Sequence, residues 1–118
     1  MAKPSMTLLQ GTLDLVVLKA LMFGPRHGYE VARWVRATTD GELKVDDGAL
    51  YTALHRLQRR GWLKSEWGAT EQNRRAKYYA LTAAGRRQLA SEANSWERYA
   101  NAMLKVLSAT EYTAQEAP

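Results

Sequence analysis

The sequence predicts a mainly α-helical α+β fold, and three observations support that prediction. Three stretches with the apolar spacing of helices come first, two alternating stretches joined by a polar turn follow, and a long stretch with a heptad pattern comes last. The chain of 118 residues can bury one hydrophobic core but not two. With 46% hydrophobic and 25% charged residues, it has the composition of an ordinary folded domain.

The first predicted helix covers 6–23 and is apolar on almost every side. We therefore expect it to be buried on more than one face. Pro25 follows and ends the helix, because proline has no N–H to continue the hydrogen-bond ladder. Asp14 stands out on this apolar helix: it could face a gap at an interface or pair with a basic residue such as Arg98.

The second predicted helix covers 28–38. Val31, Trp34 and Val35 recur there at i, i+3 and i+4, which is the spacing of one helical face. The segment 39–44 is polar and contains an Asp-Gly pair, so we expect it to be a turn.

The third predicted helix covers 47–60, with its three leucines on one face. Asp46 or Asp47 is expected to cap its start, because an aspartate side chain can accept hydrogen bonds from the free N–H groups of a first helical turn. The pattern assigns no role to the other aspartate of this pair. Gly61 is expected to end the helix.

Two alternating stretches, 62–67 and 77–81, predict a β-hairpin. The segment between them, 68–75, carries a glycine, an asparagine and two arginines and would form a charged tip. Three helices followed by a hairpin is the element order of a winged helix-turn-helix. In that fold the third helix enters the major groove of DNA, and the hairpin, called the wing, reaches a neighbouring phosphate strand.

The last predicted helix covers 83–108, is capped by Thr82, and carries the strongest pattern in the chain. Apolar residues recur at intervals of 4, 3, 4, 3 and 4, which is the a/d seam of a coiled coil. The seam consists of Leu89, Ala93, Trp96, Ala100, Met103 and Leu107. It favours a homodimer whose interface also includes Leu9 and Leu13 of the first helix; the alternative is that the seam packs on the first helix of its own chain.

These elements suggest three parts of the chain. We expect a winged helix-turn-helix over 1–82, of which helix 6–23 also contributes to the dimer interface, a dimerisation helix over 83–109, and a disordered tail over 110–118. Two copies would present two third helices to two DNA half-sites, about 34–36 Å apart.

The composition restricts the classes of function. Seventeen Lys and Arg against twelve Asp and Glu give a net charge of +5, which favours a polyanionic partner such as DNA. The chain has no cysteine and two histidines, so we expect no catalytic site, metal or cofactor. No apolar run is long enough to span a bilayer and no signal-peptide pattern is present, so we expect a cytoplasmic protein.

Candidate DNA contacts lie on the third helix, just before it, and on the wing. Gly48 and Ala49 are small enough to let the helix backbone approach DNA. Guanidinium groups at the wing tip suit phosphates because they stay charged and donate several hydrogen bonds, although they could also be solvated turn charges. The complete set is Tyr29, Lys44, Gly48, Ala49, Tyr51, Thr52, His55, Arg56, Asn73, Arg74, Arg75 and Lys77.

Several strings of these residues resemble the PadR family of transcriptional regulators. They are LQGTLDL at 9–15, HGY at 27–29, GALYTALHRL at 48–57, GWL at 61–63 and RRAKYYALT at 74–82. The resemblance extends over about 8–107 and, with one C-terminal helix, is to the short subgroup of the family. It implies a homodimeric winged-helix protein, usually a repressor, that binds a pseudo-palindromic operator.

The resemblance also implies a small aromatic or drug-like effector. In drug-responsive members of the family, a tryptophan of the last helix stacks on flat ligands at the dimer centre. Trp96 stands at the matching place, and Leu8, Asp14 and Leu15 match other residues that line that site. From the residues alone, Trp96 could instead be interface packing. An alternative function is a winged-helix interaction module that does not bind DNA, for which the wing arginines would have no use.

Overall fold

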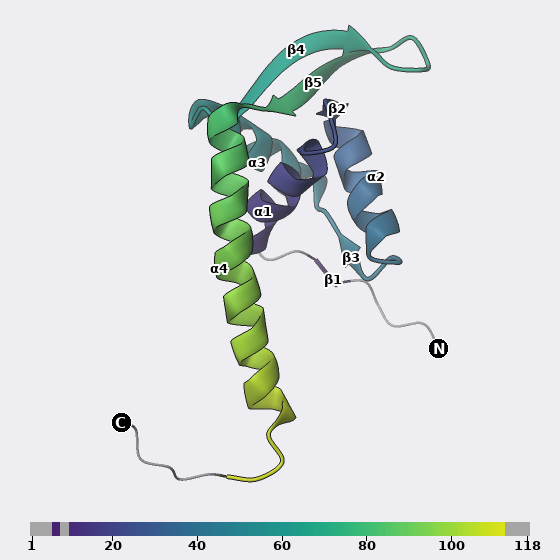
Figure 1. The fold of residues 1–118 in the computed structure, drawn as a ribbon. Coiled ribbons are helices and arrows are strands. Elements are labelled where there is room, and N and C mark those ends of the chain that lie inside the picture. Colours follow the sequence, from purple (N-terminus) through teal and green to yellow (C-terminus); the bar gives the residue numbers. More distant parts are fainter. Residues whose placement is uncertain (1–5, 8–9, 113–118) are drawn as a thin grey trace.

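The computed structural model describes residues 6–7 and 10–112 and has the winged helix-turn-helix fold that the sequence predicts (Figure 1). Three helices form a bundle, a three-stranded sheet covers one end of it, and a long last helix runs along the bundle and beyond it. The elements are β1 (Met6–Thr7), α1 (Gln10–Leu21), β2 (Arg26–His27), α2 (Gly28–Thr38), β3 (Leu43–Lys44), α3 (Asp47–Arg59), β4 (Leu63–Ala69), β5 (Arg75–Leu81) and α4 (Ala83–Ser108).

The hydrophobic core lies where α1, α2, α3 and the sheet meet. Val17 and Leu18 of α1, Val31 of α2 and Leu57 of α3 have no measurable solvent exposure. Each buried side chain of this size stabilises the fold by about 1.5–3 kcal/mol relative to its exposed state. The apolar faces that the sequence assigns to the three helices therefore hold the bundle together.

Helix caps fix the start of α3 and of α4. The Asp46 carboxylate accepts a hydrogen bond from the Ala49 backbone N–H at 3.0 Å, which selects Asp46 over Asp47 as the cap of α3. The Thr82 hydroxyl accepts from Gly85 N at 3.0 Å and donates to the Gly61 carbonyl at 2.7 Å. It thereby joins the start of α4 to the turn that follows α3.

The first helix is shorter than predicted, since α1 begins at Gln10 and ends at Leu21 rather than covering 6–23. Met6–Thr7 instead forms β1, which pairs in parallel with β3 inside the segment that was predicted to be a turn. A strand of two residues has no period of its own, so apolar spacing alone extends the predicted helix to residue 6. Leu8 and Leu9 lie outside the described residues.

The wing is longer than predicted and has an additional strand. β4 and β5 pair from Leu63↔Leu81 to Ala69↔Arg75, two ladder positions beyond the predicted strand ends at 67 and 77. β2 adds to the other edge of β5 and anchors the loop before α2 to the sheet. The backbone pairing of Arg26–His27 leaves no signal in side-chain alternation, which is why this strand was missed.

The helix α4 has the predicted bounds and two different surroundings. With 26 residues it is about 39 Å long. Its first half packs on α1 and β5, while its second half extends past the bundle (Figure 1). Gly85 permits the close packing, because a Cβ atom there would lie 2.1 Å from the Trp62 carbonyl oxygen. Residues 113–118 of the predicted tail lie outside the described residues.

Candidate nucleic-acid interface

The face of α3 opposite its leucines is open to solvent. Gly48, Thr52, His55 and Arg59 recur there at intervals of 4, 3 and 4 residues, so they form one stripe along the helix. All four residues are exposed, and Tyr51 is 64% exposed on the flank of the stripe. Three of the four were predicted as DNA contacts. Arg59 was missed, although its spacing from His55 could have identified it.

A groove of about 600 Å³ separates α3 from the wing. It gathers side chains from α2, α3, β4 and β5 that are far apart in the sequence. Its lining includes His27, Tyr29, Tyr51, His55, Trp67, Arg75, Lys77 and Tyr79. Aromatic rings and cations in one groove can contact both the sugar edges and the phosphates of a nucleic-acid strand.

Trp67 is the main residue of this groove that the sequence reasoning missed as a contact. It is 58% exposed on β4, and the Arg75 guanidinium lies 4.3 Å from its ring centroid. Lys77, opposite Trp67 in the ladder, places its Nζ 6.0 Å from the same centroid. Cation–π attraction therefore holds two predicted phosphate ligands over one exposed indole. This cluster depends on the strand register, which the sequence did not reveal.

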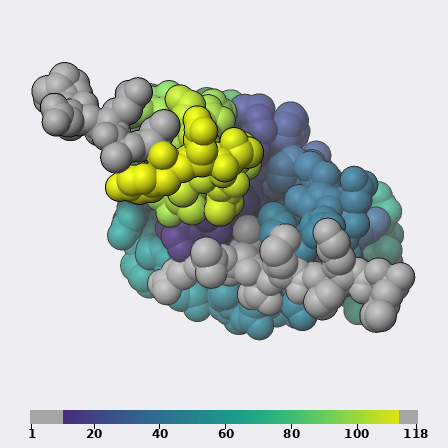
Figure 2. Space-filling view, turned by 90° about the horizontal axis from the view of Figure 1, so that it is seen from below, coloured from purple at the N-terminus to yellow at the C-terminus, as the bar shows by residue number. Residues whose placement is uncertain are grey.

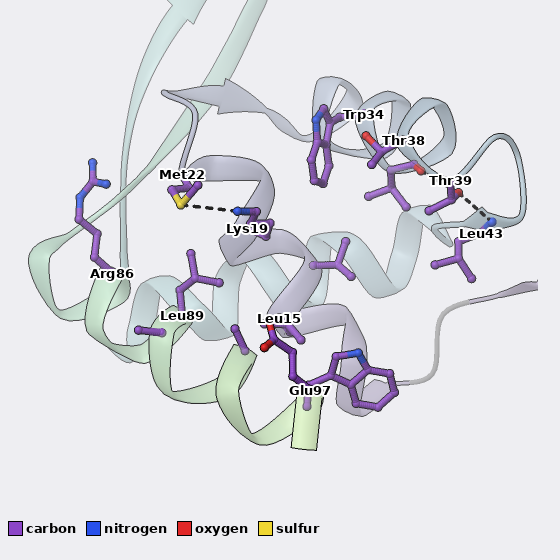
Figure 3. A pocket seen from close by; sticks show the side chains of 15 residues that line it. Leu15, Lys19, Met22, Trp34, Thr38, Thr39, Leu43, Arg86, Leu89 and Glu97 are labelled. Carbon is purple, nitrogen blue, oxygen red and sulfur yellow. Dashed lines mark hydrogen bonds between the residues drawn. The ribbon is translucent and has the colours of Figure 1, made fainter. Parts of the chain in front are cut away.

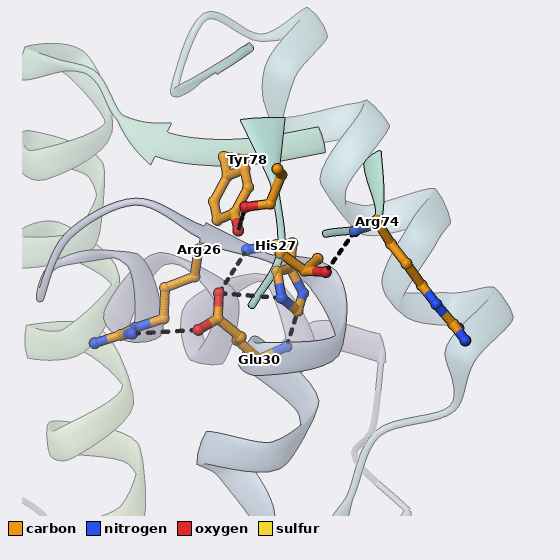
Figure 4. A network of polar contacts seen from close by, with 7 residues as sticks. Arg26, His27, Glu30, Arg74 and Tyr78 are labelled. Carbon is orange, nitrogen blue, oxygen red and sulfur yellow. Dashed lines mark hydrogen bonds and ion pairs between the residues drawn. The ribbon is translucent and has the colours of Figure 1, made fainter. Parts of the chain in front are cut away.

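The start of α2 is tied to the wing through His27 (Figure 4). The Glu30 backbone N–H donates to His27 Nδ1 at 3.4 Å, and the His27 N–H donates to Glu30 Oε1 at 3.2 Å, which together form a capping box. The His27 ring also meets the Tyr78 ring edge-on, with 5.4 Å between centroids. This network holds the exposed Tyr29, which is 69% accessible, at the mouth of the groove.

The wing tip is held by its own hydrogen bonds. Thr70 Oγ1 accepts from the Arg74 backbone N–H at 3.1 Å, and Asn73 adopts a φ of 60°, which asparagine tolerates better than most residues. The Tyr78 hydroxyl donates to the Ala69 carbonyl at 3.0 Å. The exposed side chain of Arg74 extends away from the network in Figure 4. Asn73 and Arg75 are exposed as well, so the predicted tip residues are all accessible.

Arg56 differs from the other predicted contacts because its guanidinium forms an ion pair inside the chain. Its Nε donates to Asp14 Oδ2 at 3.4 Å, and its Nη2 donates to Asp14 Oδ1. Both side chains are about one-fifth exposed, so solvent screens the pair only in part. Asp14 thus has a basic partner, as one alternative held, but that partner is Arg56 on α3 and not Arg98.

Burial changes the chemistry of one tyrosine under the groove. Tyr79 is 3% exposed, and its burial raises the pKa of its phenol above the ordinary value of about 10. The neighbouring Tyr51 phenol raises that pKa further. Tyr79, which lines the groove, therefore keeps its phenol proton to a higher pH than an exposed tyrosine does.

A second cavity, of about 570 Å³, lies between α1, α2 and α4 (Figure 3). Leu15, Trp34, Leu89 and Trp96 supply apolar walls, and Lys19, Arg86 and Glu97 supply charged groups. Two of the predicted effector ligands, Leu15 and Trp96, line this cavity, whereas Asp14 does not. Asp14 belongs to the ion pair with α3.

The second half of α4 leaves its apolar residues in solvent. Figure 2 looks at the molecule from the projecting end of α4, which stands beside α1 and α2. In the seam, Trp96 is 43% exposed, Met103 40% and Leu107 74%, whereas Leu89 is buried at 7%. Ala93 and Ala100 are half-buried. Leu13, also predicted at the dimer interface, is buried in the core of its own chain.

The described part of the chain holds neither a cluster of metal-binding side chains nor a membrane-spanning helix. Over residues 6–7 and 10–112, no group of three or more His, Cys, Asp or Glu side chains is arranged to hold a metal ion. In the same residues, no helix has the length and apolar character needed to cross a lipid bilayer.

An exposed third helix, a basic wing and an aromatic groove between them define a winged-helix DNA-binding protein. The model of the PadR-like family of transcriptional regulators matches residues 17–91, and the chain belongs to that family. It is therefore a DNA-binding transcriptional regulator and not an enzyme, as the sequence predicts.

Three solved structures illustrate the similarity. A transcriptional regulator from Clostridium thermocellum is 30% identical, with a TM-score of 0.73 over 81% of this chain and 90% of its own. A PadR family regulator from Eggerthella lenta is 29% identical, with a TM-score of 0.69 over 86% of each chain. A PadR family regulator from Clostridium difficile is 25% identical, with a TM-score of 0.69 over 82% of this chain and 99% of its own.

Proposed function

We propose that this regulator is a homodimeric repressor that binds a pseudo-palindromic operator in the cytoplasm. The observation that carries the proposal is the uncovered apolar half of α4. Beyond the bundle, Tyr99 and Leu104 are each 59% exposed and Leu107 is 74% exposed. Large apolar side chains that lie exposed together on one helix mark an interaction surface.

A second copy of the chain fits this surface best. The seam of α4 continues at heptad spacing past the last residue that its own bundle buries, Leu89, and a coiled-coil seam takes another helix as its partner. The apolar cavity between α1, α2 and α4 lies next to the same face. The outer half of one α4 can pack against the cavity side of the partner, and the two-fold symmetry makes the contact reciprocal.

Such a dimer would present two copies of α3 to successive major grooves. The stripe of Gly48, Thr52, His55 and Arg59 would face the bases, while Arg74 and Arg75 would reach the phosphates beside each groove. Lys44 and Tyr29, which are exposed around the same face, would add contacts to the DNA backbone, and the exposed Ala49 would face the groove beside the stripe. A dimer bound across a promoter excludes polymerase, which is the simplest route to repression.

The cavity beside α4 supports a planar effector as the signal for release. Leu15 and Trp96 line it, and Trp34 adds a second indole. Such a wall of apolar and aromatic groups with a few charged side chains is typical of small-ligand sites. The dye anilinonaphthalene sulfonate should fluoresce on binding there, and Trp96→Ala should weaken that signal while Trp67→Ala should not. Equal signals from wild type and Trp96→Ala would contradict this site.

To test DNA binding, the protein is titrated into labelled DNA from upstream of the gene that encodes it. Fluorescence anisotropy measures the binding at several salt concentrations. Binding should weaken steeply with salt, because each phosphate contact releases counterions. Replacing Arg74 and Arg75 by Ala should lower the affinity at least tenfold. Arg36→Ala, the control for either wing arginine replaced singly, removes one positive charge from the far end of α2 and should have little effect.

An interaction module that does not bind DNA would give a different result. Its binding to DNA would be weak and equal for all sequences, and the two wing arginines would not matter more than Arg36. That outcome would overturn the proposed function.

A further inference from the structure

We propose that α3 recognises thymine methyl groups in the major groove, and that Thr52 and Ala49 are the residues that determine this specificity. The inference rests on the proposed function, in which α3 enters the groove. It goes beyond that proposal because it names the chemical group that is read and the side chains that read it.

The first step is the set of side chains that α3 offers to DNA. Its first two turns, 47–54, contain no Arg, Lys, Asn or Gln, the side chains that form the common two-point hydrogen bonds to guanine and adenine. Within those turns the outer face consists of Gly48, Ala49 and Thr52. Asp47 and Tyr51 are exposed too, but they lie on the flank that lines the groove beside the wing.

The second step is that the nearest guanidinium is already engaged. Arg56 follows Thr52 by one helical turn and would be the natural ligand of a guanine. Both its Nε and its Nη2 donate to the Asp14 carboxylate, and the side chain is only 22% exposed. The ion pair therefore withholds from the bases beside Thr52 the guanidinium nearest to them, whereas the exposed Arg59 lies further along the stripe, toward the end of α3.

The third step concerns the hydroxyl of Thr52. Its Oγ1 donates to the Gly48 carbonyl at 3.0 Å, so its one proton is used within the helix. What Thr52 then offers to DNA is its methyl group and an acceptor. Ala49, on the same side of the helix, offers a second methyl group.

The fourth step is that these methyl groups can come close to the base edges. Gly48 has no side chain, and the cap carboxylate of Asp46, whose Oδ2 would lie 3.4 Å from a Cβ built on Gly48, is the one group that stands beside the helix at that position. In the major groove, the C5-methyl of thymine is the apolar group that distinguishes A·T and T·A from the other pairs. Methyl against methyl is the contact that this surface can make.

The experiment begins with selection of binding sites by the full-length protein from a random duplex library. In the enriched sequence, each thymine of one half-site is then replaced in turn by deoxyuridine, which lacks the methyl group but pairs identically. Wild type should lose about fourfold in affinity at one or two positions, as expected for one buried methyl group. Replacement of the other thymines should change little.

Two variants assign the effect to Thr52. Thr52→Ser keeps the hydroxyl and removes the methyl, so it should bind thymine and deoxyuridine sites equally at the sensitive position. Thr52→Val keeps a methyl and removes the hydroxyl, so it should retain the fourfold difference. Thr52 is exposed, and thermal melting of both variants should match that of wild type.

The outcomes separate this inference from the proposed function. An enriched sequence with no position sensitive to deoxyuridine would overturn the inference while the DNA-binding function stands. Equal sensitivity in wild type and Thr52→Ser would also overturn it. Failure to enrich any sequence would overturn both.

Discussion

The two halves of α4 carry one continuous apolar seam but have different partners. In the inner half, Leu89 is buried at 7% against α1 and the sheet, and Gly85 lets the helix touch the turn after α3. In the outer half, Trp96 and Leu107 are 43% and 74% exposed. The heptad pattern does not change between them.

A heptad pattern thus identifies an apolar seam that another helix can cover, but it does not identify that helix. The sequence left two alternatives, packing on the first helix of the same chain or on a second chain. In the inner half the seam packs on the first helix of the same chain, and this burial stabilises the fold of the single chain. The outer half projects beyond the bundle, and the proposed dimer would cover it.

The largest expected effect is on the inner half. Leu89→Ala should lower the free energy of unfolding by about 3 kcal/mol, because it removes a buried leucine and leaves a cavity. Denaturant titration measures this loss, and it should be the same at low and high protein concentration if the inner half serves the monomer fold. A loss that depends on protein concentration would place Leu89 at the interface between chains instead.

Substitutions in the outer half should weaken the dimer and leave the fold of the single chain intact. The double substitution Met103→Asp and Leu107→Asp puts two charges into the uncovered seam and should raise the dimer dissociation constant at least 100-fold, which corresponds to about 2.7 kcal/mol. Light scattering after size-exclusion chromatography measures the mass. Lys105→Ala and Ser108→Ala, on exposed positions of the same turns, serve as the control. The far-UV circular dichroism spectrum should stay helical, since these side chains lie outside the core. Loss of the helical spectrum would contradict the claim that the outer half of α4 does not stabilise the fold of the single chain.

The ion pair between α1 and α3 should give a smaller change. Asp14→Asn removes the carboxylate from the half-buried Arg56 and should cost roughly 1–2 kcal/mol of stability. The freed guanidinium can then reach a phosphate, so the salt dependence of DNA binding should become steeper by about one unit of slope. Glu42→Gln, at an exposed position, should change neither quantity. An unchanged slope would mean that Arg56 cannot reach the DNA even without its partner.

The smallest effect is expected at alkaline pH. The raised pKa of Tyr79 means that the folded state keeps the phenol proton where the unfolded state loses it. Its contribution to stability is therefore full below about pH 10 and declines as the pH rises further. Denaturant titrations from pH 9 to 11 should show a shallower decline for Tyr79→Phe than for wild type. Tyr112→Phe, at a side chain that is 92% exposed, should follow wild type.

Several parts of the fold could be predicted because local chemistry determines them. The bounds of α2 and α4 follow from apolar spacing and from the Thr82 cap, and the wing follows from alternation. The Asp14–Arg56 pair could not be found in this way, since its members are 42 residues apart. The Trp67–Arg75 cluster depends on the strand register, and β1 and β3 are too short to show a period.

In the candidate site, too, the sequence predicts what local chemistry determines and misses what depends on distant contacts. Exposed α3 and wing residues were predicted because they are the side chains left over once the leucines are placed in the core. Which of them are free to contact DNA depends on contacts between distant segments. Arg56 is engaged by α1, whereas His55, one residue earlier, remains on the open stripe.

Sedimentation equilibrium of the full chain at micromolar concentration tests the central claim, that the outer half of α4 binds a second copy, most directly. The account predicts a mass twice that of the 13.3 kDa chain. A mass of one chain at every concentration up to about 100 µM, well above the micromolar dissociation constants of stable dimers, would contradict it.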